Sequence, residues 1–288
     1  MYEKGVRIIR GDRNPVKLLF GHTPEACTEP VDFEHACFAN RMALMDIHLW
    51  KAFLTDTACP PWPCPCCKAG VLTLSKGALK SKTTVASMAD RNEDWWDSDH
   101  VVLSFTAWAT CSNKLCAETF ALAGDGGVEM VPDEDDNTDY ANYFQLRYCH
   151  PLLELIAIPK NCPAPVSKAL HAAFALYWID RPSAAGRIRV ALERLLDHLG
   201  VPAQTPGGKY VPLDTRVDQF SKTDPAHGAQ LMALKWLGNV GSHTIDVNKD
   251  DLLAAFQVLE HALSELVEKK SAMIAKLAAD MTAKYKAL

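Results

Sequence analysis

The chain has 288 residues, a formal net charge of −5 and 48% hydrophobic residues. This length is enough for a sizeable core and predicts about two domains. The sequence contains no apolar run of the roughly 20 residues that a membrane span needs, and its first residues lack the apolar stretch of a secretory signal, so we expect a cytoplasmic protein with no membrane partner.

The charge is distributed unevenly along the chain. Residues 59–150 carry 7 Lys or Arg against 13 Asp or Glu, whereas residues 151–288 carry 16 against 14. Neither part has the strong positive excess that is typical of a duplex-DNA binder.

The first segment, residues 1–58, indicates local structure only. Its stretch RIIRGDRNPVKLLF predicts a strand, a turn and a second strand. Further on, Phe38, Met42, Met45 and Leu49 have the spacing of one helical face. We expect a supporting helix here and assign no functional role to the segment.

Two cysteine pairs indicate a metal-binding module over residues 59–123. The stretches VLTLS and HVVLSFTAWAT predict strands, and each adjoins one pair. In a reducing compartment, clustered cysteines favour metal over disulfides. Two knuckles joined by strands predict a zinc-ribbon-like module with one structural zinc ion, and its expected ligands are Cys64, Cys67, Cys111 and Cys116.

The ligand set is not unique, because Cys59 and Cys66 lie beside or within the first knuckle. Six buried free thiols are one alternative to a zinc site. A redox or iron–sulfur role is another.

Two polar stretches of the N-terminal half carry no chemistry that we can assign. The stretch ADRNEDWWDSDH contains Trp95 and Trp96, which could stack on bases. The surrounding carboxylates would repel phosphate, so packing within a hairpin or against a partner is favoured. Residues 124–150 begin with GDGGVEM and include a dense acidic run, which predicts an exposed linker.

From residue 151 to residue 288 the pattern is helical. RPSAAGRIRVALERLLDHLG predicts a helix with Ser183 as N-cap and Gly200 after its end. Residues 226–237 predict another helix, and Asn248 can cap a long last helix from about residue 249. The sequence thus predicts an α+β protein in which a small β-rich part precedes a helical domain.

Two stretches of the helical part, IRVALERLLDHLG and LMALKWLGNVGSH, resemble the domain-of-unknown-function family 4145. With the cysteine pairs included, the resemblance covers roughly residues 60–268. The residues that carry it in the helical part are Pro163, Ala172, Arg189, Leu192, Glu193, Lys235, Gly238, Asn239 and His243.

This resemblance implies a HEPN-like helical bundle. Many HEPN domains are metal-independent ribonucleases that act as dimers in defence systems, with an Arg, Asn and His signature. Aligning Asn239 and His243 with that signature puts Gly238 where the arginine belongs. Lys235 or Arg189 could supply the missing positive charge, although Glu193 is placed to pair with Arg189.

The resemblance therefore leaves three functions open. The first is a non-catalytic or weakly catalytic module of a prokaryotic or phage defence-type system that binds nucleic acid or a nucleotide and forms a homodimer. The second is an endoribonuclease in which His243, Lys235 and Asn239 are catalytic and Arg189 and Glu193 bind the substrate. The third is an adaptor that binds a protein partner and no RNA. The glycine at position 238 favours the first. A structural role is the favoured alternative for these residues, in which Gly238 breaks or bends the helix and Asn239 and His243 hydrogen-bond helix ends across the bundle.

Overall fold

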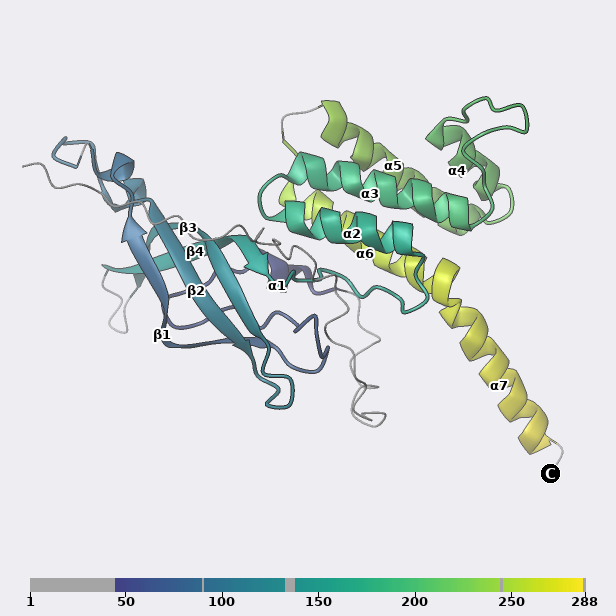
Figure 1. The fold of residues 1–288 in the computed structure, drawn as a ribbon, viewed down its shortest axis with the longest axis horizontal. Helices are drawn as coiled ribbons and strands as arrows, with labels where there is room; N and C mark the ends of the chain where they lie inside the picture. The colour runs from purple at the N-terminus through teal and green to yellow at the C-terminus, as the bar shows by residue number, and fades with distance from the viewer. Residues whose placement is uncertain (1–44, 90, 133–137, 244–245, 287–288) are drawn as a thin grey trace, which may run out of the picture.

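The computed structural model describes residues 45–89, 91–132, 138–243 and 246–286. They form an antiparallel sheet followed by a helical region, which confirms the predicted α+β class (Figure 1). The sheet has the order β1-β2-β3-β4, with β1 Leu72–Thr83, β2 Leu103–Cys111, β3 Thr119–Pro132 and β4 Thr138–His150. The strand–turn–strand predicted near the N-terminus lies outside the described residues, and the helix expected after it is described only as α1, Ile47–Lys51.

The sheet has one buried and one open face, and β2 shows the reason. Its residues alternate strictly between buried and exposed, because successive side chains of a strand point to opposite faces. Leu103, Phe105 and Ala107 face the core, whereas Ser104, Thr106 and Trp108 face solvent. Between β1 and β2 the chain makes two short 3-10 turns, Ala86–Met88 and Ser98–His100.

Three tryptophans join the sheet to the helices. The rings of Trp50 and Trp62 are stacked with centroids 6.5 Å apart, and Trp178 contacts both at 6.2 and 5.6 Å. Beside them, the Tyr177 hydroxyl donates a hydrogen bond to the Trp50 carbonyl over 2.9 Å. All three tryptophans are at least nine-tenths buried, so the two parts of the chain share one core.

The structure differs from the linker expected at residues 124–150. Apart from residues 133–137, which lie outside the described part, this stretch belongs to the β3–β4 hairpin. Its glycines permit close pairing of strands and do not mark a flexible segment. A Cβ on Gly124 would lie 2.1 Å from the Gln145 carbonyl oxygen and 2.8 Å from the Phe105 ring. In β4, Phe144 and Leu146 are buried in the alternating pattern of a strand. This pattern was not recognised because glycines and carboxylates dominate the preceding residues.

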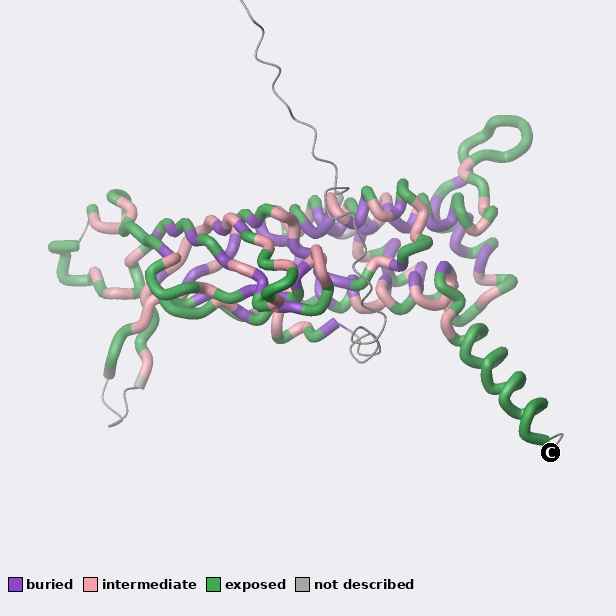
Figure 2. Tube along the Cα trace, turned by 60° about the horizontal axis from the view of Figure 1, so that its bottom comes forward, coloured by how far each residue is buried: buried purple, intermediate pink, exposed green. Residues whose placement is uncertain are grey.

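The helical region is a bundle of α2, α3, α5 and α6, with α4 packed on α5 (Figure 1). The bounds are α2 Ala164–Tyr177, α3 Arg181–His198, α4 Leu213–Ser221, α5 Pro225–His243, α6 Lys249–Leu263, the π-helical turn Ser264–Glu268 and α7 Lys270–Lys286. Buried residues run through both sheet and bundle, whereas α7 is exposed along its length (Figure 2). In the described part of the chain, no helix combines the length and apolarity needed to cross a membrane.

Three details of the helices differ from the sequence prediction. The N-cap of α3 is Asp180, whose carboxylate accepts hydrogen bonds from the Ser183 N–H and hydroxyl at 2.9 and 2.5 Å. The last helix is interrupted, because Lys269 adopts a left-handed conformation with φ 55°. Helix α4 lies between α3 and α5, in a stretch where no helix was predicted. The Asn248 cap of α6 is confirmed, since its side chain accepts the Asp250 N–H.

Candidate functional site

Residues 64–70 form the first cysteine knuckle. The Lys68 N–H donates to the Cys64 carbonyl over 3.0 Å, and Lys68 itself has a left-handed φ of 56°. This turn directs the Gly70 N–H to the Cys67 sulfur at 3.4 Å. A Cβ on Gly70 would lie 2.5 Å from the Cys111 sulfur, so glycine is needed for the two knuckles to meet.

The second knuckle, residues 111–118, repeats this geometry despite its longer spacing. The N–H groups of Cys116 and Ala117 both donate to the Asn113 carbonyl, at 3.0 and 2.8 Å. Ala117 is left-handed with φ 48°, as Lys68 is in the first knuckle. The next backbone N–H, that of Glu118, donates to the Cys116 sulfur. Each knuckle therefore presents a sulfur that already accepts a backbone hydrogen bond.

Antiparallel pairing of β1 with β2 brings the knuckles together, because Leu72 pairs with Cys111. The sulfurs of Cys64, Cys67, Cys111 and Cys116 all lie within 4.8 Å of one another. Two of the separations are 3.8 Å, Cys64 to Cys116, and 3.6 Å, Cys67 to Cys111. Four thiolates at about 2.3 Å from a tetrahedral ion stand about 3.8 Å apart. The four cysteines therefore have the geometry to hold a metal ion.

The protonation of these thiols depends on burial and on nearby N–H groups. Burial raises the pKa of Cys67, but donors from Ala69 and Gly70, with the contacts to Cys111 and Asn113, outweigh it and lower the pKa to about 6. For Cys116, burial dominates and raises the pKa to about 11. Because metals bind the thiolate, Cys67 is ready to act as a ligand near neutral pH.

The two cysteines that left the ligand set open lie outside the four-sulfur cluster. Cys59 donates to the Leu72 carbonyl over 3.3 Å, and burial raises its pKa to about 11. Cys66 lies inside the first knuckle in sequence, but its sulfur is directed to the Glu118 carboxylate at 3.8 Å. Neither belongs to the group of sulfurs that could hold a metal among the described residues.

In the helical bundle, Arg189 joins α3 to α5. Its guanidinium donates a hydrogen bond to the Asn239 side-chain oxygen and forms an ion pair with Glu193 at 3.5 Å. A Cβ on Gly238 would lie 2.6 Å from the Arg189 Cβ, so glycine allows this close approach of the two helices. The structure thus brings together four of the residues that carry the family resemblance and gives them a packing role.

The other two candidates, Lys235 and His243, lie on the same helix, α5. The ammonium of Lys235 lies 3.8 Å from the Trp236 ring centroid, and the residue is only 6% exposed. Helix α5 continues to His243, so the GNVGSH stretch belongs to this helix. The side chain of His243 lies outside the described part, and its catalytic role stays a prediction.

The adjacent tryptophans at 95 and 96 have different surroundings. The Trp96 indole N–H donates to the Ser87 carbonyl over 3.1 Å, which packs it within the β1–β2 connection. Trp95 is 57% exposed, and its ring contacts the edge of His100.

Sequence reasoning missed the open face of the sheet. The register places Lys80, Thr106, Ala123 and Tyr148 side by side in one row across the four strands. Trp108 lies two residues along β2 from Thr106, on the same face. The alternation in β2 could have placed Trp108 on a polar face, but only the pairing of four strands shows what lies beside it.

Comparisons with known families divide the chain in the same way as the structure. Residues 52–151 match the model of a family described as Domain of unknown function (DUF8608). Residues 171–286 match that of Domain of unknown function (DUF4145), which supports the resemblance stated for the helical part. The part that contains the cysteines and the sheet therefore matches a different family from the helical part, and the match to DUF4145 does not extend to it. No curated protein and no solved structure matches the chain.

Proposed function

We propose that the protein is a non-catalytic binding module in which a structural zinc ion stabilises the sheet and the open face of that sheet binds single-stranded nucleic acid. The observation that carries the nucleic-acid part is the row of exposed side chains across the four strands. The homodimer and the defence-type setting are predictions from the resemblance and are not needed for this activity.

Zinc is proposed from the chemistry of the donor set. Four thiolates in a tetrahedral arrangement favour zinc and, with no open coordination position, a structural role. We expect about one zinc ion per chain by elemental analysis. Cys111→Ser should abolish it, whereas Cys66→Ser should retain it, because the Cys66 sulfur points to Glu118. Equal metal loss in both variants would contradict the ligand set.

Two observations favour a role without catalysis. The positive charge of Arg189 is already balanced by Glu193, and its guanidinium also binds Asn239. Lys235 is only 6% exposed and lies against the Trp236 ring, so its ammonium is not presented to a phosphate. We therefore expect the purified protein to leave RNA uncleaved. Cleavage that His243→Ala abolishes in a folded variant would overturn this part of the proposal.

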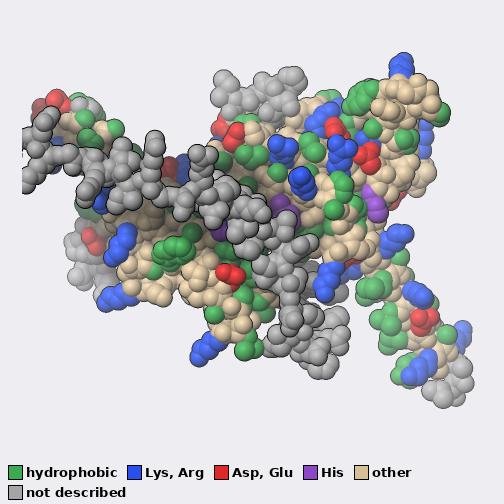
Figure 3. Space-filling view, in the orientation of Figure 1, with side chains coloured by type: hydrophobic (Ala, Val, Ile, Leu, Met, Phe, Trp, Pro, Cys, Tyr) green, Lys and Arg blue, Asp and Glu red, His purple; other side chains and the backbone are tan. Residues whose placement is uncertain are grey.

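Nucleic-acid binding is proposed from the aromatic and basic groups on the open face. The side chains of Trp108 and Tyr148 are 62% and 58% exposed. They lie on β2 and β4, which are separated by β3, so their strands are about 10 Å apart. Such exposed rings are typical of surfaces on which unpaired bases stack. Lys80 lies in the same row as Tyr148, and Lys82 lies one row further along β1. Figure 3 shows basic side chains over β1 with hydrophobic side chains beside them.

One carboxylate on this face, that of Asp125, repels phosphate less than a free carboxylate would. Asp125 accepts two hydrogen bonds from the Arg147 guanidinium, at 2.9 and 3.0 Å, and the ion pair balances its charge. The rows across the sheet therefore present lysines and aromatic rings without an unpaired acidic group at their centre.

Fluorescence anisotropy with labelled single-stranded RNA and DNA tests this proposal. Trp108→Ala should weaken binding about tenfold, the effect of removing one stacking ring. Trp95→Ala removes a similarly exposed tryptophan of the β1–β2 connection, outside the four strands, and should leave binding unchanged. Lys80→Gln should lower the salt dependence of binding by about one phosphate contact. Absence of binding at low salt, or equal losses in both tryptophan variants, would refute the proposal.

A further inference from the structure

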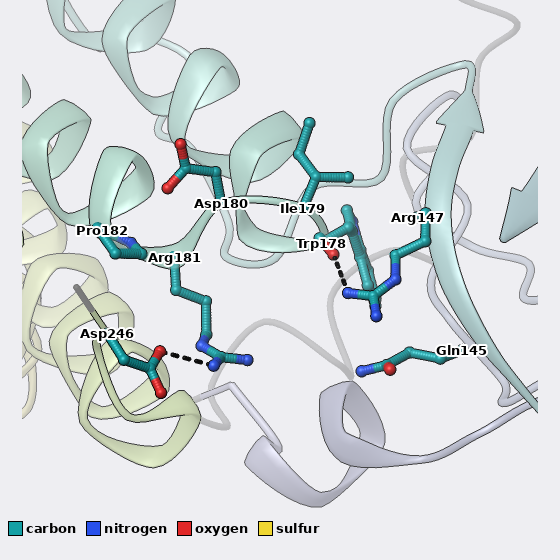
Figure 4. A pocket seen from close by; sticks show the side chains of 8 residues that line it. All are labelled: Gln145, Arg147, Trp178, Ile179, Asp180, Arg181, Pro182 and Asp246. Carbon is teal, nitrogen blue, oxygen red and sulfur yellow. Dashed lines mark hydrogen bonds and ion pairs between the residues drawn. The ribbon is translucent and has the colours of Figure 1, made fainter. Parts of the chain in front are cut away.

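A cavity of about 370 Å³ lies where the sheet meets the helical bundle, apart from the four-cysteine cluster (Figure 4). Strand β4 lines one side of it and the connection from α2 to α3 lines the other. The lining residues are Gln145, Arg147, Trp178, Ile179, Asp180, Arg181, Pro182 and Asp246. Its volume falls in the range of small-molecule sites, about 300–1,000 Å³.

Two arginines from different elements face this space. Figure 4 shows the guanidinium groups of Arg147 and Arg181 and the Gln145 amide directed toward the same region. Asp180, in contrast, points away from the arginines, because its carboxylate caps α3 through Ser183.

Both guanidinium groups retain free hydrogen-bonding capacity with respect to the described residues. An arginine has five N–H donors. Arg147 uses three of its five, two to Asp125 and one to the Trp178 carbonyl. Arg181 uses two, one to the Val247 carbonyl and one to Asp246. Hydrogen bonds to the protein thus hold each guanidinium group in place, and several N–H donors of the two groups remain for a ligand.

The surroundings of the cavity add further positive charge. Lys51 and Lys249 lie close by, on α1 and at the start of α6. Burial lowers the pKa of Lys249, and the nearby Arg181, Lys51 and Arg147 lower it further. Lys51, Arg147 and Arg181 each have a carboxylate partner, whereas within the described part Lys249 contacts only aromatic rings, about 5.9 Å from its ammonium.

We propose that this cavity binds the phosphate group of a small phosphate monoester, held between Arg147 and Arg181. Guanidinium groups that approach from two elements suit a tetrahedral oxyanion, which presents oxygens in several directions, better than a planar carboxylate. The cavity is larger than one phosphate and leaves room for the organic part of the ligand.

This site goes beyond the proposed nucleic-acid binding, because Arg181 and the connection from α2 to α3 line it, although Arg147 also pairs with Asp125 of the open face. Trp108 and Lys80 carry the one function, whereas Arg147 and Arg181 carry the other. The variants that test nucleic-acid binding therefore differ from the Arg181 variant that tests the cavity, and either proposal can fail while the other stands.

Isothermal titration calorimetry of the full chain with inorganic phosphate, phenyl phosphate and benzoate tests the site. We expect phenyl phosphate to bind more tightly than benzoate. Arg181→Gln should weaken it at least about tenfold, as expected for loss of charge-assisted hydrogen bonds. Asp246→Asn removes a carboxylate that competes for Arg181 and should tighten binding. Arg194→Gln is the matched control on the same helix, since Arg194 pairs with Asp197 away from the cavity, and it should bind as the parent does.

Oligonucleotides with and without a terminal phosphate distinguish the two sources of the group. Tighter binding of the phosphorylated strand that Arg181→Gln abolishes would extend the site to nucleic-acid ends. If the phosphate makes no difference, the ligand is a free phosphate monoester, provided that phenyl phosphate binds. No binding of phenyl phosphate at millimolar concentration, or equal binding by the parent and Arg181→Gln with circular dichroism unchanged, would overturn the proposal.

Discussion

Gly238 determines how closely α5 approaches α3. The position of its missing side chain is occupied by the Arg189 Cβ, and Arg189 in turn binds Glu193 and Asn239. A glycine in the middle of a helix normally destabilises it by up to about 1 kcal/mol relative to alanine. Here the close contact of two helices explains why that cost is accepted.

Replacing Gly238 by alanine should destabilise the protein, because the new methyl group would meet Arg189 Cβ at 2.6 Å. We expect a loss of about 1–3 kcal/mol in the free energy of unfolding, measured by urea denaturation. Gly186→Ala is the control, since nothing lies within 4 Å of a Cβ at that helical glycine. It should be neutral or stabilising by up to about 1 kcal/mol. The same sign for both variants would show that packing does not explain Gly238.

Asp180 should make the stability of α3 depend on pH. Hydrogen bonds from the Ser183 hydroxyl and N–H hold the pKa of its carboxyl below the usual value. Its contribution is therefore fully present above the ordinary pKa of about 3.9, and is lost as the pH falls through the lower folded-state pKa.

Thermal unfolding of Asp180 variants between pH 2 and 7, a range chosen about the ordinary aspartate pKa, tests this expectation. Asp180→Ala should lose about 1 kcal/mol at neutral pH, and Asp180→Asn much less, because asparagine also caps helices. Neither variant should show the acid dependence of this carboxyl. An unchanged acid dependence in both would assign it to other groups.

These residues mark the limit of what the sequence could predict. The spacing of Cys64, Cys67, Cys111 and Cys116 was sufficient to nominate the four cysteines whose sulfurs the structure brings together. The role of Gly238 could not be predicted, because it depends on which residue of another helix lies opposite. The cap at Asp180 was missed for a local reason, since Ser183 seemed a suitable cap three residues later.

Helix α7 differs from every other long helix in having no buried residue. A left-handed residue, Lys269, separates it from α6, and α7 extends away from the bundle (Figure 1). Hydrophobic side chains nevertheless repeat along it, and the exposed ones are Met273, Ile274, Leu277, Met281 and Tyr285. In the isolated chain this helix contributes no burial to the core.

Truncation after Lys269 should therefore leave the midpoint of thermal unfolding of the rest unchanged. Most helical stability in proteins comes from burial of an apolar face, and α7 buries none. Leu263→Ala, at the end of α6, is the contrasting variant. Leu263 is fully buried, and its truncation should cost about 2–5 kcal/mol. A large loss on removing α7 would show that it packs on a second copy in solution, which size-exclusion chromatography of both forms would reveal.

The elements also differ in how well their sequence predicts them. Helices α3 and α6 were both predicted, because each combines a regular apolar spacing with residues suited to capping near its start. The β3–β4 hairpin was mistaken for a linker, because Gly124, Gly126 and Gly127 serve close contacts with β4 and the neighbouring rings. Such contacts arise only when the strands pair.

Across the whole molecule, side-chain contacts link the four-cysteine cluster to the helical bundle. Lys68, in the first knuckle, pairs with Glu154 at 2.5 Å, and Glu154 contacts His171 of α2 at 3.6 Å. Behind this bridge, Trp50 and Trp62 pack on Trp178 at the end of α2. The division into two modules was predictable from the cysteines and the helical pattern, but their shared core was not, because Trp50 and Trp178 are far apart in sequence.

Removal of the metal should therefore destabilise both modules together. Thermal unfolding in the presence of a chelator is expected at a lower temperature, both in the near-ultraviolet signal of the tryptophans and in the far-ultraviolet signal of the helices. Cys66→Ser should respond as the parent does, because Cys66 lies outside the four-cysteine cluster. A helical transition that stays in place while the tryptophan signal shifts would show that the modules unfold independently.

The order of the ligands along the chain has a consequence for biosynthesis. All four cysteines precede residue 117, and the hairpin of β1 and β2 alone aligns the two knuckles. Domains generally fold as units during synthesis, the N-terminal one first. If the four cysteines hold a metal ion, the nascent chain can therefore bind it before any residue of the bundle has left the ribosome. The folded knuckles would then present Lys68 to Glu154, which precedes the helices of the bundle.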